Sequence, residues 1–263
     1  MSDNFQKPQG TKLTKTSPFK EVEVFEKELK AFANKYKTII SEHASRISDY
    51  FEMSCFNMIA RYYEYRGYTI TVENEQAGRF RFKCSPSGLI ENFSYMKLDK
   101  NGAIFHLYHN ASVQSAHDDE VFTTPDILVA KDVKPAVTTD YYKTKKKFSY
   151  LRNSEMITFC EVKNFTPYPE LMINFIGTVN ELKPTCLQEG TGEEAQADHL
   201  APSLMMSGGF SKPTKKVAHS LQKRYYVNIL GDLFFEPYKK TFTMTGVSEM
   251  ATLGRKKVEE NEL

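Results

Sequence analysis

The sequence has no run of about 18 apolar residues, so it offers no segment that would cross a membrane as a helix. Its first twenty residues, MSDNFQKPQGTKLTKTSPFK, also lack the apolar stretch that a secretory signal requires. Four cysteines are present, but none are paired at C-x-x-C spacing, which argues against a zinc ribbon or a dithiol redox motif. We therefore expect reduced thiols in a cytoplasmic protein with no membrane partner.

A large charge excess is missing too, because 35 Lys and Arg residues against 33 Asp and Glu residues leave a formal net charge of +2. This balance argues against a histone-like protein that binds nucleic acid through its overall field. It leaves open a nucleic-acid enzyme, in which the position of the positive charge matters more than its sum. Hydrophobic residues form 40% and aromatic residues 13% of the chain, a globular composition that excludes collagen-like and wholly disordered proteins.

Composition and periodicity divide the chain into four parts. Residues 1–20 are polar and aperiodic, which predicts a disordered tail. Residues 21–50 are predicted to be an N-terminal helical extension, because apolar residues recur there at steps of three and four. Residues 51–245 are predicted to form one domain with a basic insertion at 131–154, and residues 246–263 a charged C-terminal tail. The apolar stripe of the extension packs either on the protein's own core or against a second copy in a homodimer.

The pattern changes at Gly67 from helical periodicity to short β-rich segments. Strands are predicted at 68–73, 79–84, 93–98, 103–110, 125–130 and 156–163. Asn101-Gly102 predicts a tight hairpin turn between two of them. Helices are then predicted at 169–182 and 214–230, with an apolar strand at 199–206 between them.

Two of the predicted strands hold charged residues among apolar ones. Asp126 begins one strand, and Glu161 and Lys163 flank Val162 in the other. Alternation places Glu161 and Lys163 on one face of their strand, with Val162 pointing into the core. If the two strands pair, Asp126 faces Glu161 across about 4.8 Å, a distance at which two carboxylates repel each other. A divalent cation would remove this conflict, and oxygen ligands without nearby His or Cys favour Mg²⁺ or Mn²⁺.

Such a site suits the hydrolysis of phosphodiesters. A metal ion polarises the phosphodiester and helps to deprotonate water. Lys163 would orient the attacking water and stabilise the negative charge that develops in the transition state. A second interpretation stays open, in which Asp126 is a surface residue and Glu161 and Lys163 form an ordinary ion pair on an edge strand.

Pro125-Asp126, followed 35 positions after the aspartate by Glu161-Val162-Lys163, resembles the motif of the PD-(D/E)xK nuclease superfamily. The predicted order of elements over residues 51–231 is also similar to that of the superfamily. The resemblance implies an α/β fold with a restriction-endonuclease-like core, in which helices flank a central mixed sheet. It further implies that Asp126, Glu161 and the backbone carbonyl of Val162 bind the metal, and that Lys163 is the catalytic lysine.

The family resemblance also implies a further acid on the first core helix, for which Glu64 and Glu52 are both candidates. It implies a Mg²⁺- or Mn²⁺-dependent DNA endonuclease of restriction or defence type that acts on double-stranded DNA. An alternative from another class is a module that keeps the fold but only binds nucleic acid or protein.

Basic residues offer two candidate contacts to nucleic acid. In the insertion they alternate with aromatic residues, and they are Lys143, Lys145, Lys146, Lys147 and Arg152. This mixture suits phosphate contacts combined with base stacking, and it suits a solvated loop equally well. Lys216 and Lys223 share one face of the last predicted helix, which lies along a nucleic-acid backbone or simply faces water. His106 and His109 are three apart on a predicted strand, so we expect packing or surface roles for both.

Overall fold

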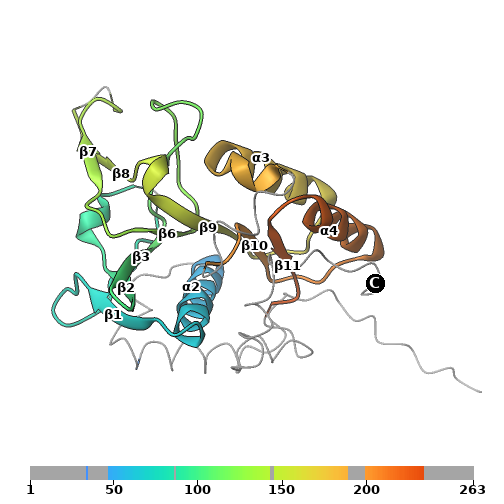
Figure 1. Cartoon of the computed structure of the whole chain (residues 1–263), viewed down its shortest axis with the longest axis horizontal. Helices are drawn as coiled ribbons and strands as arrows, with labels where there is room; N and C mark the ends of the chain where they lie inside the picture. The colour runs from blue at the N-terminus through green and yellow to red at the C-terminus, as the bar shows by residue number, and fades with distance from the viewer. Residues whose placement is uncertain (1–33, 35–46, 86, 143–144, 189–198, 234–263) are drawn as a thin grey trace, which may run out of the picture.

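The computed structural model describes residue 34 and residues 47–85, 87–142, 145–188 and 199–233 (Figure 1). The predicted tails and most of the predicted N-terminal extension lie outside these residues. The described part is a mixed α/β fold with one large sheet at its centre, as the sequence predicted.

Seven strands form this central sheet within the described ranges: β1 (Thr69–Glu73), β2 (Tyr95–Lys100), β3 (Ala103–His109), β6 (Ile127–Lys131), β9 (Met156–Lys163), β10 (Ser203–Met206) and β11 (Asn228–Leu230). They are arranged in the order β1-β2-β3-β6-β9-β10-β11. The strands from β1 to β9 pair antiparallel, whereas β10 is parallel to both β9 and β11. The sheet is therefore mixed, and the two strands with the candidate site residues, β6 and β9, are neighbours.

Helices cover both faces of the sheet (Figure 1). Those described are α2 (Ile47–Tyr65), α3 (Pro169–Leu182) and α4 (Lys212–Arg224). Phe56 of α2 packs in one buried cluster with Val162 of β9. Phe175 of α3 and Leu221 of α4 pack in the other buried cluster with Phe159 of β9. Strand β9 thus contributes side chains to two cores, one on each side of the sheet.

The remaining described elements are small. They are the paired strands β4 (Val113–Gln114) and β5 (Phe122–Thr123), the paired strands β7 (Ala136–Thr138) and β8 (Phe148–Tyr150), and the 3-10 turns η2 (Ile90–Asn92), η3 (Asn153–Glu155) and η4 (Pro184–Leu187). The predicted insertion at 131–154 therefore contains a hairpin of its own, β7–β8, between β6 and β9.

Local sequence signals explain several of these boundaries. Asn101 and Gly102 have φ angles of 55° and 83°, which are the left-handed values that a type I′ hairpin turn needs between β2 and β3. Pro169 stands at the start of α3, where a missing N–H costs nothing, and Pro184 follows its end. Strand 156–163 and helix 169–182 were predicted with the bounds that the structure shows.

Two predicted elements were wrong. Segment 79–84 is not a strand, because only Arg79 forms an isolated bridge there. Phe80 and Phe82 are buried, so the alternation was real, but the segment joins no ladder. The predicted helix 214–230 is also wrong in its second half, since α4 ends at Arg224 and residues 228–230 form β11. Residues 228–230 form a strand because the edge of β10 offers them backbone hydrogen bonds. Helical periodicity in the sequence cannot show that this edge is available.

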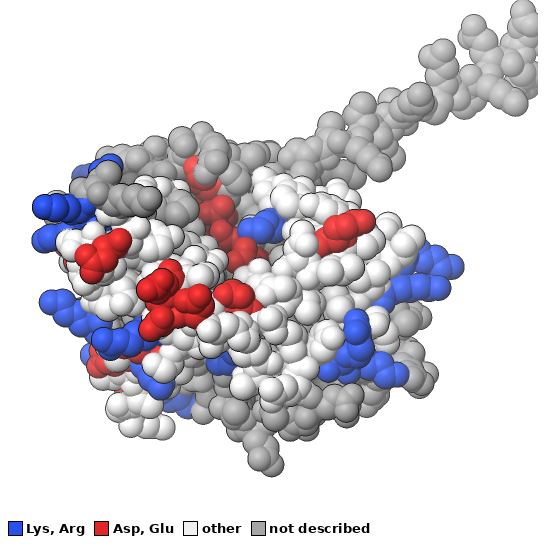
Figure 2. All heavy atoms as spheres, turned by 90° about the horizontal axis from the view of Figure 1, so that it is seen from above, with Lys and Arg blue, Asp and Glu red and all other residues white. Residues whose placement is uncertain are grey.

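The surface of the described part has an uneven distribution of charge. Figure 2 shows acidic side chains gathered near the middle of the face seen from above and basic side chains towards its two sides. No helix of the described ranges is long and apolar enough to span a bilayer.

Candidate functional site

Asp126, Glu161 and Lys163 converge at the junction of β6 and β9. Ile127 of β6 is opposite Cys160 of β9, so Asp126, one residue before β6, lies beside Glu161. Lys163 Nζ is 3.1 Å from Asp126 Oδ2 and 2.8 Å from Glu161 Oε2. The structure thus brings the three residues together from two segments that the β7–β8 insertion separates.

The backbone of both strands holds Asp126 in place. Its Oδ2 accepts a hydrogen bond of 2.6 Å from the Val162 amide, and its carbonyl oxygen accepts one of 2.9 Å from the Asn110 amide. Val162 is buried against α2, so alternation puts Glu161 and Lys163 on the opposite side of β9, as predicted. Their side chains are 16% and 30% exposed and that of Asp126 is 15% exposed, so part of each side chain reaches solvent.

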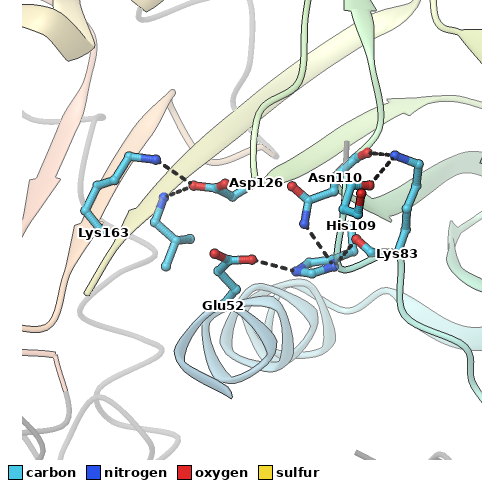
Figure 3. A network of polar contacts seen from close by, with 8 residues as sticks. Glu52, Lys83, His109, Asn110, Asp126 and Lys163 are labelled. Atoms are coloured by element: carbon cyan, nitrogen blue, oxygen red, sulfur yellow. Dashed lines mark hydrogen bonds and ion pairs between the residues drawn. The ribbon is translucent and has the colours of Figure 1, made fainter. Parts of the chain in front are cut away.

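A third carboxyl group comes from Glu52, near the start of α2 (Figure 3). Burial and the neighbouring Asp126 carboxylate raise the pKa of Glu52 to about 7, although a hydrogen bond with the Asn110 side chain acts in the opposite direction. Glu64, the other candidate, is twelve residues further along α2, or about 18 Å along the helix axis. The structure therefore places Glu52, and not Glu64, beside Asp126.

The site holds more carboxyl groups than positive charges. Burial and the Asp126 carboxylate raise the pKa of Glu161, even though Lys163 favours its ionised form. Burial opposes the charge on Lys163, but attraction by Asp126 and Glu161 outweighs it and the lysine pKa lies above its ordinary value. A protonated Lys163 therefore faces three carboxyl groups, and the surplus favours the uptake of protons or of a cation.

His109 is a residue of this site that the sequence did not reveal. Its Nε2 lies 3.7 Å from Glu52 Oε2, while its Nδ1 donates to the Lys83 carbonyl oxygen at 2.9 Å. This contact leaves Nε2 as an acceptor, and it makes no hydrogen bond to the described residues. Burial lowers the pKa of His109 to about 4, so the ring is neutral. The predicted packing role is only part of its role, because the edge of the ring that faces away from Lys83 is turned towards Glu52 (Figure 3).

Lys83 anchors the far end of the same polar network (Figure 3). Its Nζ donates to the carbonyl oxygens of Ser85 and Asn110, both at 2.7 Å. Burial lowers the pKa of Lys83 to about 8. Since the Asn110 amide donates to Asp126, this lysine fixes the loop after β3 from which the site is supported.

The donor set suits a hard divalent cation, but the side chains are not arranged as a ready metal centre. In the described ranges no three His, Cys, Asp or Glu side chains are placed so that they could hold a metal ion together. Lys163 Nζ instead occupies the position between Asp126 and Glu161. Asp126 and Glu161, with Glu52 and the Val162 carbonyl nearby, supply the oxygen atoms that Mg²⁺ and Mn²⁺ prefer. Binding would require the ammonium group of Lys163 to move aside.

The predicted nucleic-acid contacts fall in two separate places. Lys145, Lys146 and Lys147 are exposed between β7 and β8, while Lys143 lies outside the described residues. Arg152 is also exposed and forms an ion pair of 3.3 Å with Glu155. Exposed Lys216 and Lys223 belong to α4, at the other end of the molecule from β7 and β8 (Figure 1). The structure does not bring these two groups together.

Comparison of the chain with protein-family models, with curated proteins and with solved structures finds no match. Its function has to be argued from the fold and from the cluster around Asp126.

Proposed function

We propose that this protein is a metal-dependent phosphodiesterase with a PD-(D/E)xK nuclease-like site. Within that class we propose a DNA endonuclease of restriction or defence type that acts on double-stranded DNA. The observation that carries the proposal is the contact of Lys163 Nζ with both Asp126 and Glu161, two acids that stand 35 positions apart. The motif predicts this convergence, and an ordinary surface ion pair between adjacent strands does not require a third charged residue.

Each residue has a chemical task in this proposal. Asp126 and Glu161 would hold a Mg²⁺ or Mn²⁺ ion together with the Val162 carbonyl, and the Glu52 carboxyl group, which Asp126 influences, would add negative charge to the site. The ion, when bound, supplies Lewis acidity to the phosphodiester. Lys163, released from the two carboxylates, orients the attacking water and stabilises the added negative charge. His109, with Nε2 at 3.7 Å from Glu52 Oε2, would accept a hydrogen bond from a protonated Glu52 if the two groups moved closer.

Plasmid cleavage with Mg²⁺ or Mn²⁺ tests the proposal. Glu161→Gln and Lys163→Met should each lower the cleavage rate at least a hundredfold, because each removes charge from the reacting centre. Glu64→Gln is the matched control, since it makes the same change as Glu161→Gln but on α2, away from the site. Cleavage that survives in Glu161→Gln and Lys163→Met would reject the nuclease assignment.

The alternative function is a binding module that keeps this fold without chemistry. The observation that favours it is that Lys163 already satisfies Asp126 and Glu161 as the structure stands. This alternative predicts binding to nucleic acid that weakens with salt, and no cleavage with any divalent cation.

A further inference from the structure

Two exposed aromatic pairs, one before and one after Glu161 and Lys163 in the sequence, flank the candidate catalytic residues. The first pair is Phe165 and Tyr168, which are 40% and 45% exposed. Their rings are nearly parallel, at 23°, with centroids 6.1 Å apart. Phe165 follows Lys163 by two residues, and its amide donates to the Lys163 carbonyl oxygen at 3.0 Å. The pair is therefore connected directly to the end of the strand that bears the lysine.

The loop that carries this pair is seated firmly on the fold. The Phe165 carbonyl oxygen accepts a hydrogen bond of 3.2 Å from the Gly208 amide. A Cβ atom at Gly208 would lie only 2.5 Å from Thr166 Cα, so the two backbones touch and only glycine fits there. The exposure of Phe165 and Tyr168 is thus a property of a fixed loop end.

The second pair is Tyr141 and Tyr142, which are 45% and 40% exposed. Tyr141 stacks on Phe148 with ring centroids 4.3 Å apart at 20°, and Phe122 packs edge-on against both rings. Phe122 precedes Asp126 by four residues, which limits their Cα atoms to a separation of about 14 Å. This aromatic platform is therefore connected through Phe122 of β5 to the segment that carries Asp126.

Charge complements these rings. Lys145, Lys146 and Lys147 are exposed in the same turn as Tyr141 and Tyr142, between β7 and β8. Aromatic faces next to ammonium groups match the chemistry of a nucleotide strand, which offers flat bases and phosphate charges together. Intact duplex DNA keeps its base faces stacked on one another, so exposed rings have little to gain from it.

We propose that Phe165–Tyr168 and Tyr141–Tyr142 stack on unpaired bases of a nucleic-acid strand that runs past Asp126, Glu161 and Lys163. The ligand class is therefore single-stranded nucleic acid, or a duplex with an unpaired stretch. Within the double-stranded DNA proposed above, it favours sites at which the bases are unpaired. The inference depends on the proposed function only for the position of the scissile phosphate, since the stacking itself needs no metal.

Binding without cleavage tests the inference. The full chain with Glu161→Gln, in EDTA, is titrated against a fluorescent single-stranded oligonucleotide and against the same sequence as a duplex, with fluorescence anisotropy as the readout. The single strand should bind at least tenfold more tightly than the duplex. Adding Tyr168→Ala or Tyr141→Ala should weaken single-strand binding about tenfold or more and leave duplex binding nearly unchanged.

Tyr65→Ala is the matched control, because Tyr65 is a tyrosine of similar exposure, 42%, at the end of α2. It should bind like the parent. Equal affinity for single strand and duplex, or parental affinity in both Tyr168→Ala and Tyr141→Ala, would overturn the inference. Aromatic-dependent single-strand binding without any cleavage by the unmutated protein would support the inference and reject the nuclease proposal. Cleavage of intact duplex at the same rate in Tyr168→Ala and Tyr141→Ala would support the nuclease proposal and reject the inference.

Discussion

The backbone amide of Val162 in β9 donates a hydrogen bond of 2.6 Å to Oδ2 of Asp126, which lies one residue before β6. The Asp126 side chain thereby accepts an amide that a backbone carbonyl oxygen of the neighbouring strand would otherwise accept. The acid is thereby held by a different strand from the one that carries it. This contact fixes Asp126 against Glu161 and Lys163 before any ligand arrives, and it allows structural and chemical roles of Asp126 to be separated.

Asp126→Asn and Asp126→Ala should therefore behave differently. An asparagine oxygen can still accept the Val162 amide, so Asp126→Asn should lose divalent-ion binding and cleavage with little change in stability. Asp126→Ala leaves that amide without its acceptor, and its free energy of unfolding should be lower by about 1–3 kcal/mol. Urea denaturation of both variants measures the difference. Equal stabilities would show that the hydrogen bond contributes nothing.

Glu52 should make stability depend on pH. Its pKa is raised from 4.5 to about 7 in the folded protein, so folding favours its protonated form. This contribution is fully present below pH 4.5 and is lost as the pH rises through 7, by about 3 kcal/mol. Glu52→Gln should flatten the decline of the free energy of unfolding between pH 4.5 and 7, and Glu64→Gln should not. A wild-type slope in Glu52→Gln contradicts the assignment.

Divalent cations should stabilise the protein most at high pH. Because Glu52 and Glu161 have raised pKa values, protons compete with the metal below about pH 7. Mn²⁺ at a hundred times its Kd should add about 2.7 kcal/mol to the free energy of unfolding. Thermal melts with and without Mn²⁺ at pH 8 and at pH 6 measure this effect. The shift should be larger at pH 8 and absent in Glu161→Gln; an unchanged melting temperature in the wild type at pH 8 would argue for the binding module.

Lys163→Met should destabilise the protein without metal, but this loss of stability should be recovered when metal is bound. Without metal, the variant leaves Asp126 and Glu161 facing each other with no positive charge, and it should lose about 1–2 kcal/mol of stability at pH 8. Mn²⁺ should restore this stability more than it stabilises the wild type, because no ammonium group has to be displaced. Cleavage should stay absent. Calorimetric titration with Mn²⁺ checks the affinity, and weaker binding than in the wild type would contradict the competition between lysine and metal.

His109→Phe should distinguish the contribution of the imidazole nitrogens from that of ring packing. Phenylalanine keeps the edge-on contacts with Phe56 and Phe82, but it offers nothing to Glu52 and nothing to the Lys83 carbonyl oxygen. We expect a reduction of Mn²⁺ affinity of about tenfold or more, as for other partners of metal ligands, in a protein that remains folded. Unchanged Mn²⁺ affinity would leave His109 with a packing role alone.

Much of the sheet and the trio of Asp126, Glu161 and Lys163 follow from local sequence. Strand 156–163 is a short and mostly apolar run, helix 169–182 is bounded by two prolines, and the Asn101-Gly102 turn admits few alternatives. Asp126, Glu161 and Lys163 stand out because charge in an apolar strand is costly unless it meets a partner. Such signals lie within a few residues of the element they describe, so a single sequence can carry them.

The tertiary structure alone decided the remainder. Whether Glu52 or Glu64 lies beside Asp126 depends on the position of α2 along the sheet. The sequence of the helix does not distinguish the two glutamates. His109 of β3 approaches Glu52 of α2, which lies 57 positions earlier in the chain. The sequence around either residue gives no sign of this contact. Strand β11 forms where a helix was predicted, because the open edge of β10 offers hydrogen bonds to that segment. Each of these outcomes depends on a contact with a segment that is distant in sequence. Local periodicity depends only on neighbouring residues, so it cannot predict such a contact.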